Sequence, residues 1–378
     1  MMARSVILST LVSVAAGHGT LVSPLPRNAV DRVLPVKERT PRHPCSCANA
    51  SGASCDIGQS CYWYQQGCFI GCPTCDSVSG RRQVDLCGLG WKATLPTKYR
   101  TVNRDSVPGS IYDIYQHNPW RSPGSAPVID SCGLAGGTPW SQNVSEWGDY
   151  VTTPFAKHGA RGSALKPIGS PTIWHRGGTA EVTWQSVANH GGGYAYRLCQ
   201  ADGPLTEACF QALPLDFVHG KQRLLFANGT TLLIGGTYVS EGTYPAGSSW
   251  ARNPIPPRCL GAGCYTGRPC VPCPGTAGSD CTSCDNTPEP SFTPPCDEGD
   301  KPGLCSGNQG GPVNVTSAHF YPGVSPVSII DTLALPATLA PGKYVLGWRL
   351  DCEATAQVWT NCADIEISDP VDARGRSL

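Results

Sequence analysis

The sequence predicts an all-β fold, an antiparallel β-sandwich with cysteine-rich loop insertions. Three observations support this prediction. Only 15% of the 378 residues are charged, whereas 44 glycines and 35 prolines indicate a chain rich in turns. Several short segments alternate apolar and polar residues, as half-buried strands do, and Gly/Pro turns separate them. The longest of these segments lie near the C-terminus and follow each other as a pair.

The first strands are expected in the N-terminal half of the chain. Residues 20–23 form a short edge strand that Pro24 and Pro26 end, because proline lacks the donor that a β-ladder needs. Residues 179–184 alternate Thr-Ala-Glu-Val-Thr-Trp and are typical of a half-buried strand. Two shorter strands are expected at residues 127–129 and 164–168.

Further strands are expected in the C-terminal half. Residues 195–199 lead into a loop that Cys199 and Cys209 close, and residues 224–226 and 230–234 flank Asn228-Gly229, a hairpin signal. Residues 342–352 form a strand that returns as residues 359–367. We expect Cys352 and Cys362 to link these two strands.

Residues 1–17 have the layout of a secretory signal peptide. A single basic residue, Arg4, precedes an apolar stretch, and small residues stand at Ala15 and Gly17. Cleavage after Gly17 makes His18 the N-terminus of a mature domain over residues 18–368, which a polar tail at 369–378 follows. The protein is therefore expected to be secreted and extracellular.

The 21 cysteines are concentrated in two blocks, residues 45–87 and residues 258–311. Their CxxC spacings are compatible with zinc, but in an exported chain they favour disulfides, and we expect no stoichiometric zinc. The odd number leaves one cysteine over. Asn-x-Ser/Thr sequons, expected to be glycosylated in the same compartment, lie at Asn49, Asn143, Asn228 and Asn314.

The charge balance excludes some partners. The chain has 28 Lys and Arg against 28 Asp and Glu, so nothing in it attracts nucleic acid or an anionic membrane. After the leader, no apolar run approaches the ~20 residues of a membrane-spanning helix. We therefore expect a soluble protein without a nucleic-acid or membrane partner.

His18 is the first candidate for chemistry. As an N-terminal residue it offers two nitrogens, the α-amine and the imidazole Nδ1, which close a chelate ring on one metal ion. Copper suits such a nitrogen site, and it needs one more imidazole. Among the other histidines, His190 follows a strand and precedes three glycines that allow close approach of backbone and ligand. A surface histidine is the alternative interpretation for each of them.

Three segments together resemble the lytic polysaccharide monooxygenases, in the group known as chitin-binding type 4 domains. They are His18-Gly19, the stretch Ala188-Asn-His190-Gly-Gly-Gly-Tyr194, and the pair Tyr344-Val-Leu-Gly-Trp348 and Gln357-Val-Trp359-Thr-Asn-Cys362-Ala-Asp. The resemblance implies an immunoglobulin- or fibronectin III-like sandwich. It also implies that His18 and His190 bind one copper through two imidazoles and the terminal amine.

The resemblance implies roles for two more residues. Gln357 falls where the family has a polar residue that orients oxygen species, and Trp359 falls where the family has a Tyr or Phe axial to copper. Tryptophan departs from that pattern, and the alternative is that Trp359 belongs to the core. The implied reaction is oxidative cleavage of glycosidic bonds at C1 or C4 of chitin or cellulose, with an external electron donor. This differs from hydrolysis by paired carboxylates.

Two other functions compete with this interpretation. One is a non-catalytic chitin- or cell-wall-binding protein that uses exposed Trp and Tyr side chains for adhesion. The run Tyr62-Trp63-Tyr64 is a candidate for an exposed face that stacks on sugar rings, but packing beside the cystines is the favoured interpretation. The other is a zinc hydrolase, which needs three side-chain ligands and a general base, and no HExxH spacing is present.

Overall fold

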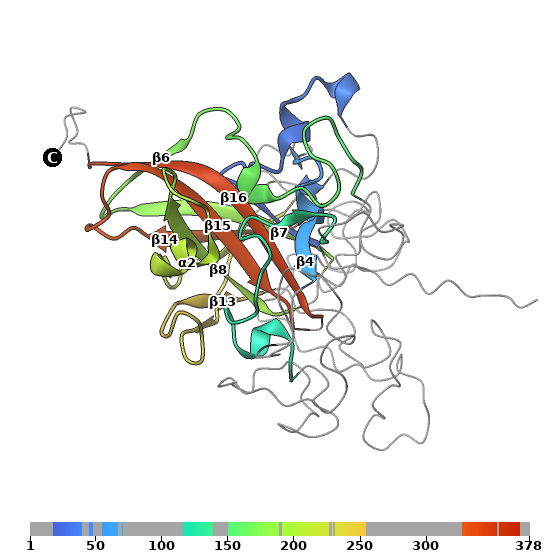
Figure 1. Ribbon diagram of the computed structural model, residues 1–378. Helices are drawn as coiled ribbons and strands as arrows, with labels where there is room; N and C mark the ends of the chain where they lie inside the picture. Colours follow the sequence, from blue (N-terminus) through green and yellow to red (C-terminus); the bar gives the residue numbers. More distant parts are fainter. Residues whose placement is uncertain are drawn as a thin grey trace, which may run out of the picture.

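The computed structural model describes residues 18–39, 45–47, 55–66, 70, 116–138, 150–188, 191–226, 229, 231–254, 327–353 and 355–370. Two β-sheets face each other over these residues, and their long strands run side by side across the molecule (Figure 1). The predicted all-β sandwich is therefore confirmed. The expected leader, the second cysteine block at 258–311 and His190 lie outside the described residues.

The first sheet, called sheet A here, has β1 at one edge. Its described strands are ordered β1-β7-β14-β10-β11, and β9 pairs with β14. All its pairs are antiparallel. The bounds are β1 His18–Ser23, β7 Thr179–Ala188, β9 Asp216–Phe217, β10 Arg223–Phe226, β11 Thr231–Leu233 and β14 Val327–Ala334.

The second sheet, sheet B, contains the longest strands. Its described strands are ordered β12-β13-β8-β15-β16-β4-β5, and β6 pairs with β16 in parallel. The bounds are β4 Trp63–Gln66, β5 Leu134–Ala135, β6 Thr172–His175, β8 Gly193–Gln200, β12 Tyr238–Val239, β13 Trp250–Arg252, β15 Gly342–Asp351 and β16 Gln357–Ser368.

Short elements complete the described chain. One is the two-stranded pair β2 Ser46–Cys47 and β3 Cys55–Asp56, and another is helix α2 Glu207–Ala212. The rest are 3-10 helices: η1 Val30–Val33, η2 Val36–Glu38, η3 Ser60–Tyr62, η4 Pro119–Arg121 and η6 Gly162–Ala164. Thr206 begins α2, because its hydroxyl accepts a hydrogen bond from the Cys209 amide at 3.3 Å.

The core lies between the two sheets and consists of side chains that alternate along each strand. From sheet A, Leu21 and Trp184 point inward, and from sheet B, Trp348 and Trp359 do so; all four are fully buried. The rings of Trp184 and Trp348 lie 5.3 Å apart across the gap between the sheets. The period of two that predicted these strands therefore also selects the core residues.

Sheet B is covered on its second face as well, whereas the described part of sheet A is covered there beside β1, where Val22 packs in a second apolar cluster. Phe210 of α2 and Cys132 pack with Val345 and Cys362 on the outer side of sheet B. This explains why eight consecutive residues of β15, Tyr344 to Asp351, are buried. On sheet A, the ion pair between Glu181 and Arg223 has side chains that are 63% and 32% exposed. Residues 179–184 of β7 show the ordinary inward and outward alternation.

Most of the expected strands are confirmed. The segments at 20–23, 179–184, 195–199 and 359–367 lie in β1, β7, β8 and β16, the segment at 342–352 matches β15 except for its last residue, and the Asn-Gly hairpin joins β10 and β11. Residues 127–129 and 164–168 are not strands. Their amides serve other partners instead, since the Ile129 amide donates to Gln65 Oε1 and the Leu165 amide donates to the Gly162 carbonyl.

Three disulfides join described cysteines. Cys199–Cys209 is as expected, Cys45–Cys61 lies within the first cysteine block, and Cys132–Cys362 connects β16 to the segment before β5. The expected link between Cys352 and Cys362 is wrong. In the antiparallel pair β15 and β16, Cys362 lies opposite Gly347, five residues from Cys352, which is ~17 Å along a strand and too far for a disulfide. Among the described cysteines, Cys352 is a buried free thiol.

The aromatic run of the first cysteine block is buried. Tyr62, Trp63 and Tyr64 are each exposed by 1% or less. Tyr62 and Trp63 pack with Cys45 and Cys61 in a second cluster beside β1. Packing beside the cystine is thus confirmed, and the hypothesis that these three rings stack on sugar is wrong.

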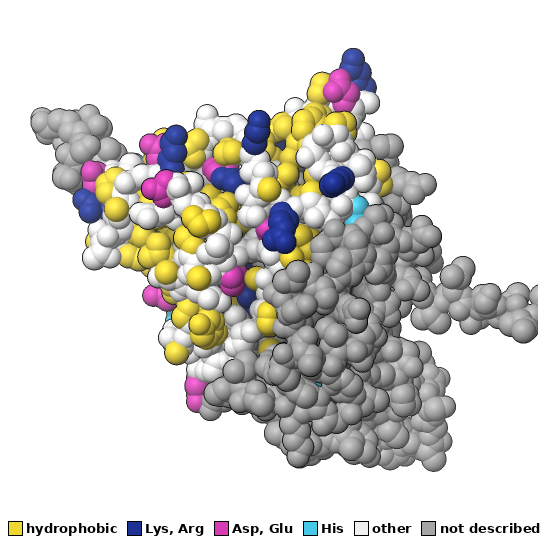
Figure 2. All heavy atoms as spheres, viewed as in Figure 1, with side chains coloured by type: hydrophobic (Ala, Val, Ile, Leu, Met, Phe, Trp, Pro, Cys, Tyr) yellow, Lys and Arg dark blue, Asp and Glu magenta, His cyan; other side chains and the backbone are white. Residues whose placement is uncertain are grey.

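Charged side chains are dispersed over the visible face of the molecule. Basic and acidic groups alternate there with apolar and uncharged ones, without a field of one sign (Figure 2). Among the described residues, no helix has both the length and the apolar character needed to span a bilayer.

One carboxylic acid lies inside the core. Asp331 of β14 is 1% exposed and accepts hydrogen bonds from the hydroxyls of Tyr194 and Tyr196, each at 3.1 Å, and from the Gln222 amide at 3.0 Å. Burial raises the pKa of Asp331 to about 6, even though these three hydrogen bonds act to lower it. Relative to the unfolded chain, folding therefore favours the protonated form of this acid.

This predicts that the stabilising contribution of Asp331 is lost as the pH rises. Its pKa is higher in the folded chain than in the unfolded chain, so the contribution is complete below about pH 4 and is lost as the pH passes 6. A shift of about two units corresponds to about 3 kcal/mol. Asp331→Asn cannot ionise. Its free energy of unfolding relative to the wild type should therefore increase by that amount between pH 4 and pH 7, as measured by urea unfolding.

The control for this experiment is Asp216→Asn, because Asp216 lies on the exposed side of β9. We expect its unfolding free energy to follow the wild type at every pH. If Asp331→Asn and the wild type kept a constant difference from pH 4 to pH 7, the buried acid would not be the source of the pH dependence.

Candidate functional site

The candidate site lies at the end of the sandwich where β1 begins. The backbone of His18 pairs with Ala188, at the end of β7. Opposed residues of antiparallel strands have Cα atoms ~4.5–5.5 Å apart. His190 follows Ala188 by two residues, and it lies outside the described residues, as does the side chain of His18. The pairing therefore brings His18 beside the chain that leads into His190.

The glycines after His190 allow the chain to pack closely on itself. Gly192 has a positive φ of 85°, and a Cβ on it would lie 2.0 Å from the Asp351 carbonyl oxygen. A Cβ on Gly193 would lie 2.3 Å from the ring of Trp120. The sequence predicted space for a ligand at these glycines. At Gly192 and Gly193, the end of β15 and an indole ring fill that space instead.

Gly19 also has a packing role. A Cβ there would lie 3.0 Å from the ring of Trp348 and 3.2 Å from Leu350 Cδ2, which is tighter than ordinary van der Waals contact. The residue after His18 therefore sits directly on the inner face of β15. Close packing of this kind fixes the height of the β1 terminus above sheet B.

Gln357 and Trp359 lie at the start of β16, at the same end of the sandwich. Gln357 is 6% exposed, and its carbonyl accepts a hydrogen bond from the Cys352 amide at 3.2 Å. Trp359 is fully buried, pairs with Leu350 of β15 and stacks on the ring of Tyr64 at 4.4 Å. Because Leu350 also contacts Gly19, Trp359 belongs to the row of side chains next to the β1 terminus.

The free thiol of Cys352 belongs to the same region. Burial raises the pKa of Cys352 well above its usual range, while hydrogen bonds with Thr355 and Trp359 act to lower it. The thiol is therefore protonated at neutral pH and packs as a small apolar group in the core.

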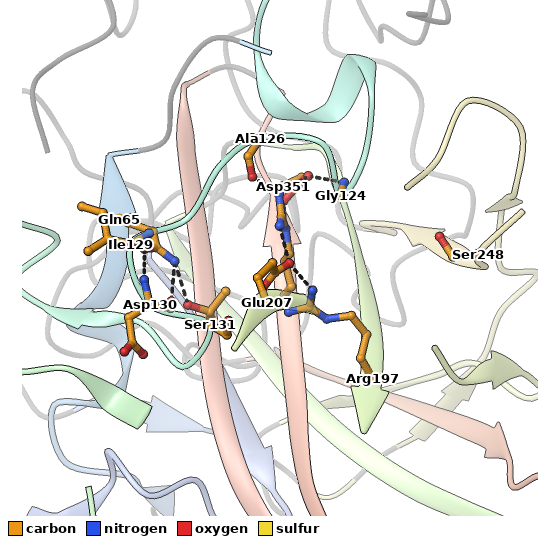
Figure 3. A network of polar contacts seen from close by, with 12 residues as sticks. Gln65, Gly124, Ala126, Ile129, Asp130, Ser131, Arg197, Glu207, Ser248 and Asp351 are labelled. Carbon is orange, nitrogen blue, oxygen red and sulfur yellow. Dashed lines mark hydrogen bonds and ion pairs between the residues drawn. The ribbon is translucent and has the colours of Figure 1, made fainter. Parts of the chain in front are cut away.

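A buried charge network supports the site from the outer face of sheet B (Figure 3). Arg349 donates to both carboxylate oxygens of Asp351, at 2.6 and 3.1 Å, and to Glu207 at 2.8 Å. Asp351 also accepts from the Gly124 amide at 2.7 Å, and Arg197 pairs with Glu207. Burial alone would raise the pKa of Glu207, but the two arginines lower it to about 2. Glu207 is thus ionised at any physiological pH.

Side-chain contacts tie the N-terminal segment to its surroundings at two residues of β1 and at Arg27, which follows it. The Leu21 amide donates to Asn361 Oδ1 at 2.7 Å, and the Thr20 hydroxyl donates to Ser60 Oγ at 2.8 Å. Further along, Arg27 forms a two-pronged pair with the carboxylate of Asp364, at 3.0 and 2.5 Å. Two of these contacts connect the N-terminal segment of sheet A to β16 of sheet B.

Asn361 and Asp351 did not emerge from the sequence as site residues. A signal for Asn361 was present, because residues at every second position of β16 from Trp359 to Ile367 face the apolar core and Asn361 is the polar member of that row. No group of three or more His, Cys, Asp or Glu side chains suited to a metal occurs within the described residues.

Comparisons with known proteins identify no family. No protein-family model and no curated protein matches the chain. Among solved structures, it is similar to a Bacillus amyloliquefaciens CBM33 protein in complex with Cu(I), with 9% identity and a TM-score of 0.21 over 53% of this chain and 56% of that one.

Two other solved structures are similar. A Burkholderia pseudomallei chitin-binding domain has 11% identity and a TM-score of 0.22 over 53% of this chain and 57% of that one. The cellulose-active monooxygenase CelS2 in complex with copper has 12% identity and a TM-score of 0.26 over 92% and 98%. The matches thus span little more than half of the first two chains. At these identities and TM-scores they assign no activity to this chain.

Proposed function

We propose that the protein is a secreted, copper-dependent monooxygenase that cleaves glycosidic bonds of an insoluble polysaccharide, chitin or cellulose. The observation that carries the proposal is the pairing of His18 with Ala188, which puts the first residue of the expected mature chain beside the segment leading into His190. The motif resemblance singles out His18 and His190, and this pairing supports the proposal because the chain that reaches Ala188 is two residues short of His190.

The donor set fits copper. A free α-amine and an imidazole from His18, with a second imidazole from His190, supply three nitrogens, which Cu(II) prefers in a planar arrangement. The reference pKa of an α-amine is about 7.7–8.0, so a metal displaces its proton readily near neutral pH. When bound, copper supplies one-electron chemistry with O₂ or peroxide, and an external donor supplies the electrons.

The remaining chain residues have supporting roles in this proposal. Gln357 is a polar side chain at the start of β16, suited to orienting an oxygen species. Trp359 closes the site on the core side, where its stacking on Tyr64 holds the ring in place. Because Trp359 has no hydroxyl, it provides an apolar wall and no oxygen ligand.

The disulfides support secretion. Six described cysteines form three bonds, and such bonds persist in the oxidising compartments of the export route. The proposal therefore includes removal of residues 1–17 during export. The rival function as a non-catalytic carbohydrate-binding protein loses its aromatic candidates, because Tyr62, Trp63 and Tyr64 are buried.

The N-terminus tests the proposal. Protein that begins at His18 should bind one copper and release oxidised sugars from chitin or cellulose when a reductant is present. A version with one extra N-terminal Gly should lose most of its copper affinity, because its His18 nitrogen is an amide. Calorimetry measures copper binding, and mass spectrometry measures the oxidised products.

His190→Ala is the second variant, and it should fail in the same way because it removes the third nitrogen. Circular dichroism of both variants controls for folding. If the extended protein or His190→Ala kept wild-type copper binding and product release, the copper site would lie elsewhere. If the processed protein bound polysaccharide but no copper, the binding-protein function would replace the proposed one.

A further inference from the structure

The strand that carries His18 pairs irregularly with its own sheet. β1 has six residues, it is the edge strand of sheet A, and it pairs with β7 on one side. Its register shifts twice, between His18 and Gly19 and between Leu21 and Ser23. At each shift the ladder is locally disrupted, so the pairing with β7 alone does not fix how the β1 terminus lies. Contacts outside the ladder therefore contribute to the position of His18.

Asn361 makes that contact from the opposite sheet. Its side chain is fully buried on β16, and its Oδ1 accepts the hydrogen bond of the Leu21 amide at 2.7 Å. Its amide group donates to the carbonyls of Thr360 at 2.8 Å and Ser60 at 3.4 Å. The oxygen of this carboxamide thus accepts a backbone N–H of β1, and its nitrogen is bound by two carbonyls. A buried amide hydrogen that loses such an acceptor is costly, so this contact is selective for one register.

The contact couples the two strands that carry the candidate site. Both β1 and β16 begin at the site end and run toward the pair Leu21 and Asn361. Two residues before that pair, Gly19 packs on Leu350, which lies opposite Trp359. His18 precedes Gly19 by one residue in β1, and Gln357 precedes Trp359 by two residues in β16. The position of Leu21 on Asn361 therefore determines how His18 lies relative to Gln357 and Trp359.

We propose that Asn361 is a positioning residue that sets the location of the His18 nitrogen donors by fixing β1 on β16. The inference rests on the proposed function for its effect on copper, whereas the effect on β1 is independent of any metal. Outer residues that orient metal ligands typically change metal affinity 10–100-fold when they are replaced.

The test compares Asn361→Leu with Asn361→Asp in protein processed to begin at His18. Leucine keeps the branched shape but removes the acceptor, so amides of residues 18–23 should exchange with deuterium at least 10-fold faster without metal. Copper affinity should fall 10–100-fold, and the Cu(II) electron paramagnetic resonance spectrum should change. Aspartate keeps an acceptor oxygen for Leu21, so it should restore the spectrum and most of the affinity.

Asn28→Leu is the control, because Asn28 is also buried and its amide donates to the same Ser60 carbonyl at 3.4 Å. It should lower stability but leave the copper spectrum and the exchange of β1 unchanged. Asn361→Ser, which shortens the acceptor, replaces Asn361→Leu if the latter is not secreted.

Wild-type affinity, spectrum and β1 exchange in the variant that lacks the acceptor would overturn the inference. A wild-type protein that binds no copper would overturn the proposed function instead. In that case the exchange of the β1 amides still decides whether Asn361 holds the strand.

Discussion

Replacing Arg349 by Met is expected to lower the free energy of unfolding by about 3–5 kcal/mol, the cost of breaking a buried ion pair by removing one partner. Arg349 and Asp351 are both fully buried, and two hydrogen bonds of the guanidinium hold the carboxylate. Without Arg349, Asp351 keeps the Gly124 amide but loses the positive charge beside it. Urea unfolding with the disulfides intact measures the change.

Arg223→Met is the control for this experiment. Arg223 pairs with Glu181 on the outer face of sheet A, where both side chains are substantially exposed. Pairs of that kind contribute about 0–1 kcal/mol, so this variant should unfold close to the wild type. Equal urea midpoints for Arg349→Met and Arg223→Met would contradict the importance of the buried network.

Replacing both Cys132 and Cys362 by Ala is expected to lower the free energy of unfolding by about 5 kcal/mol. The bond closes a loop with a sequence separation of 230 residues, and the entropy that a disulfide removes from the unfolded chain grows with loop length. It also ties β16 to the segment before β5, next to Asn361. Thermal and urea unfolding measure the loss.

The second disulfide of the same apolar cluster provides the comparison. Cys199 and Cys209 pack in the cluster that contains Cys132 and Cys362, but their separation is 10 residues. The same entropic relation predicts a loss of about 3 kcal/mol for the double alanine variant, less than for the long loop. A larger loss at the short loop would show that strain or packing, rather than chain entropy, determines the contribution of the long one.

The sequence predicted much of the fold because its strands carry local signals. A period of two between apolar and polar residues located β7, β15 and β16, and Asn228-Gly229 located the hairpin. The strand β14 was missed, although it lies at the centre of sheet A. Residues 127–129 and 164–168 were wrongly expected to be strands, because short apolar runs look alike whether their amides bind a neighbouring strand or a nearby side chain or turn.

The candidate site was predictable only in part. His18, His190, Gln357 and Trp359 were selected from motifs, and the described residues bring the backbone of His18, Gln357 and Trp359 to one end of the sandwich. The packing role of the glycines after His190 was not predictable. Asp351 and Trp120 fill the space beside Gly192 and Gly193, and both are distant in sequence. The burial of Trp359 was not predictable for the same reason, since its stacking partner Tyr64 comes from the first cysteine block.

The sequence by itself determined the all-β class, the alternation of strand faces in β7, β15 and β16, and the balance of charge, since each depends on composition or on residues a few positions apart. Only the tertiary structure decided that Cys362 pairs with Cys132 and leaves Cys352 free, that Tyr62, Trp63 and Tyr64 are buried, and that Asn361 accepts the Leu21 amide of β1. These features depend on which strands become neighbours. Strand order and register come from the summed packing of the whole core, which no local pattern records.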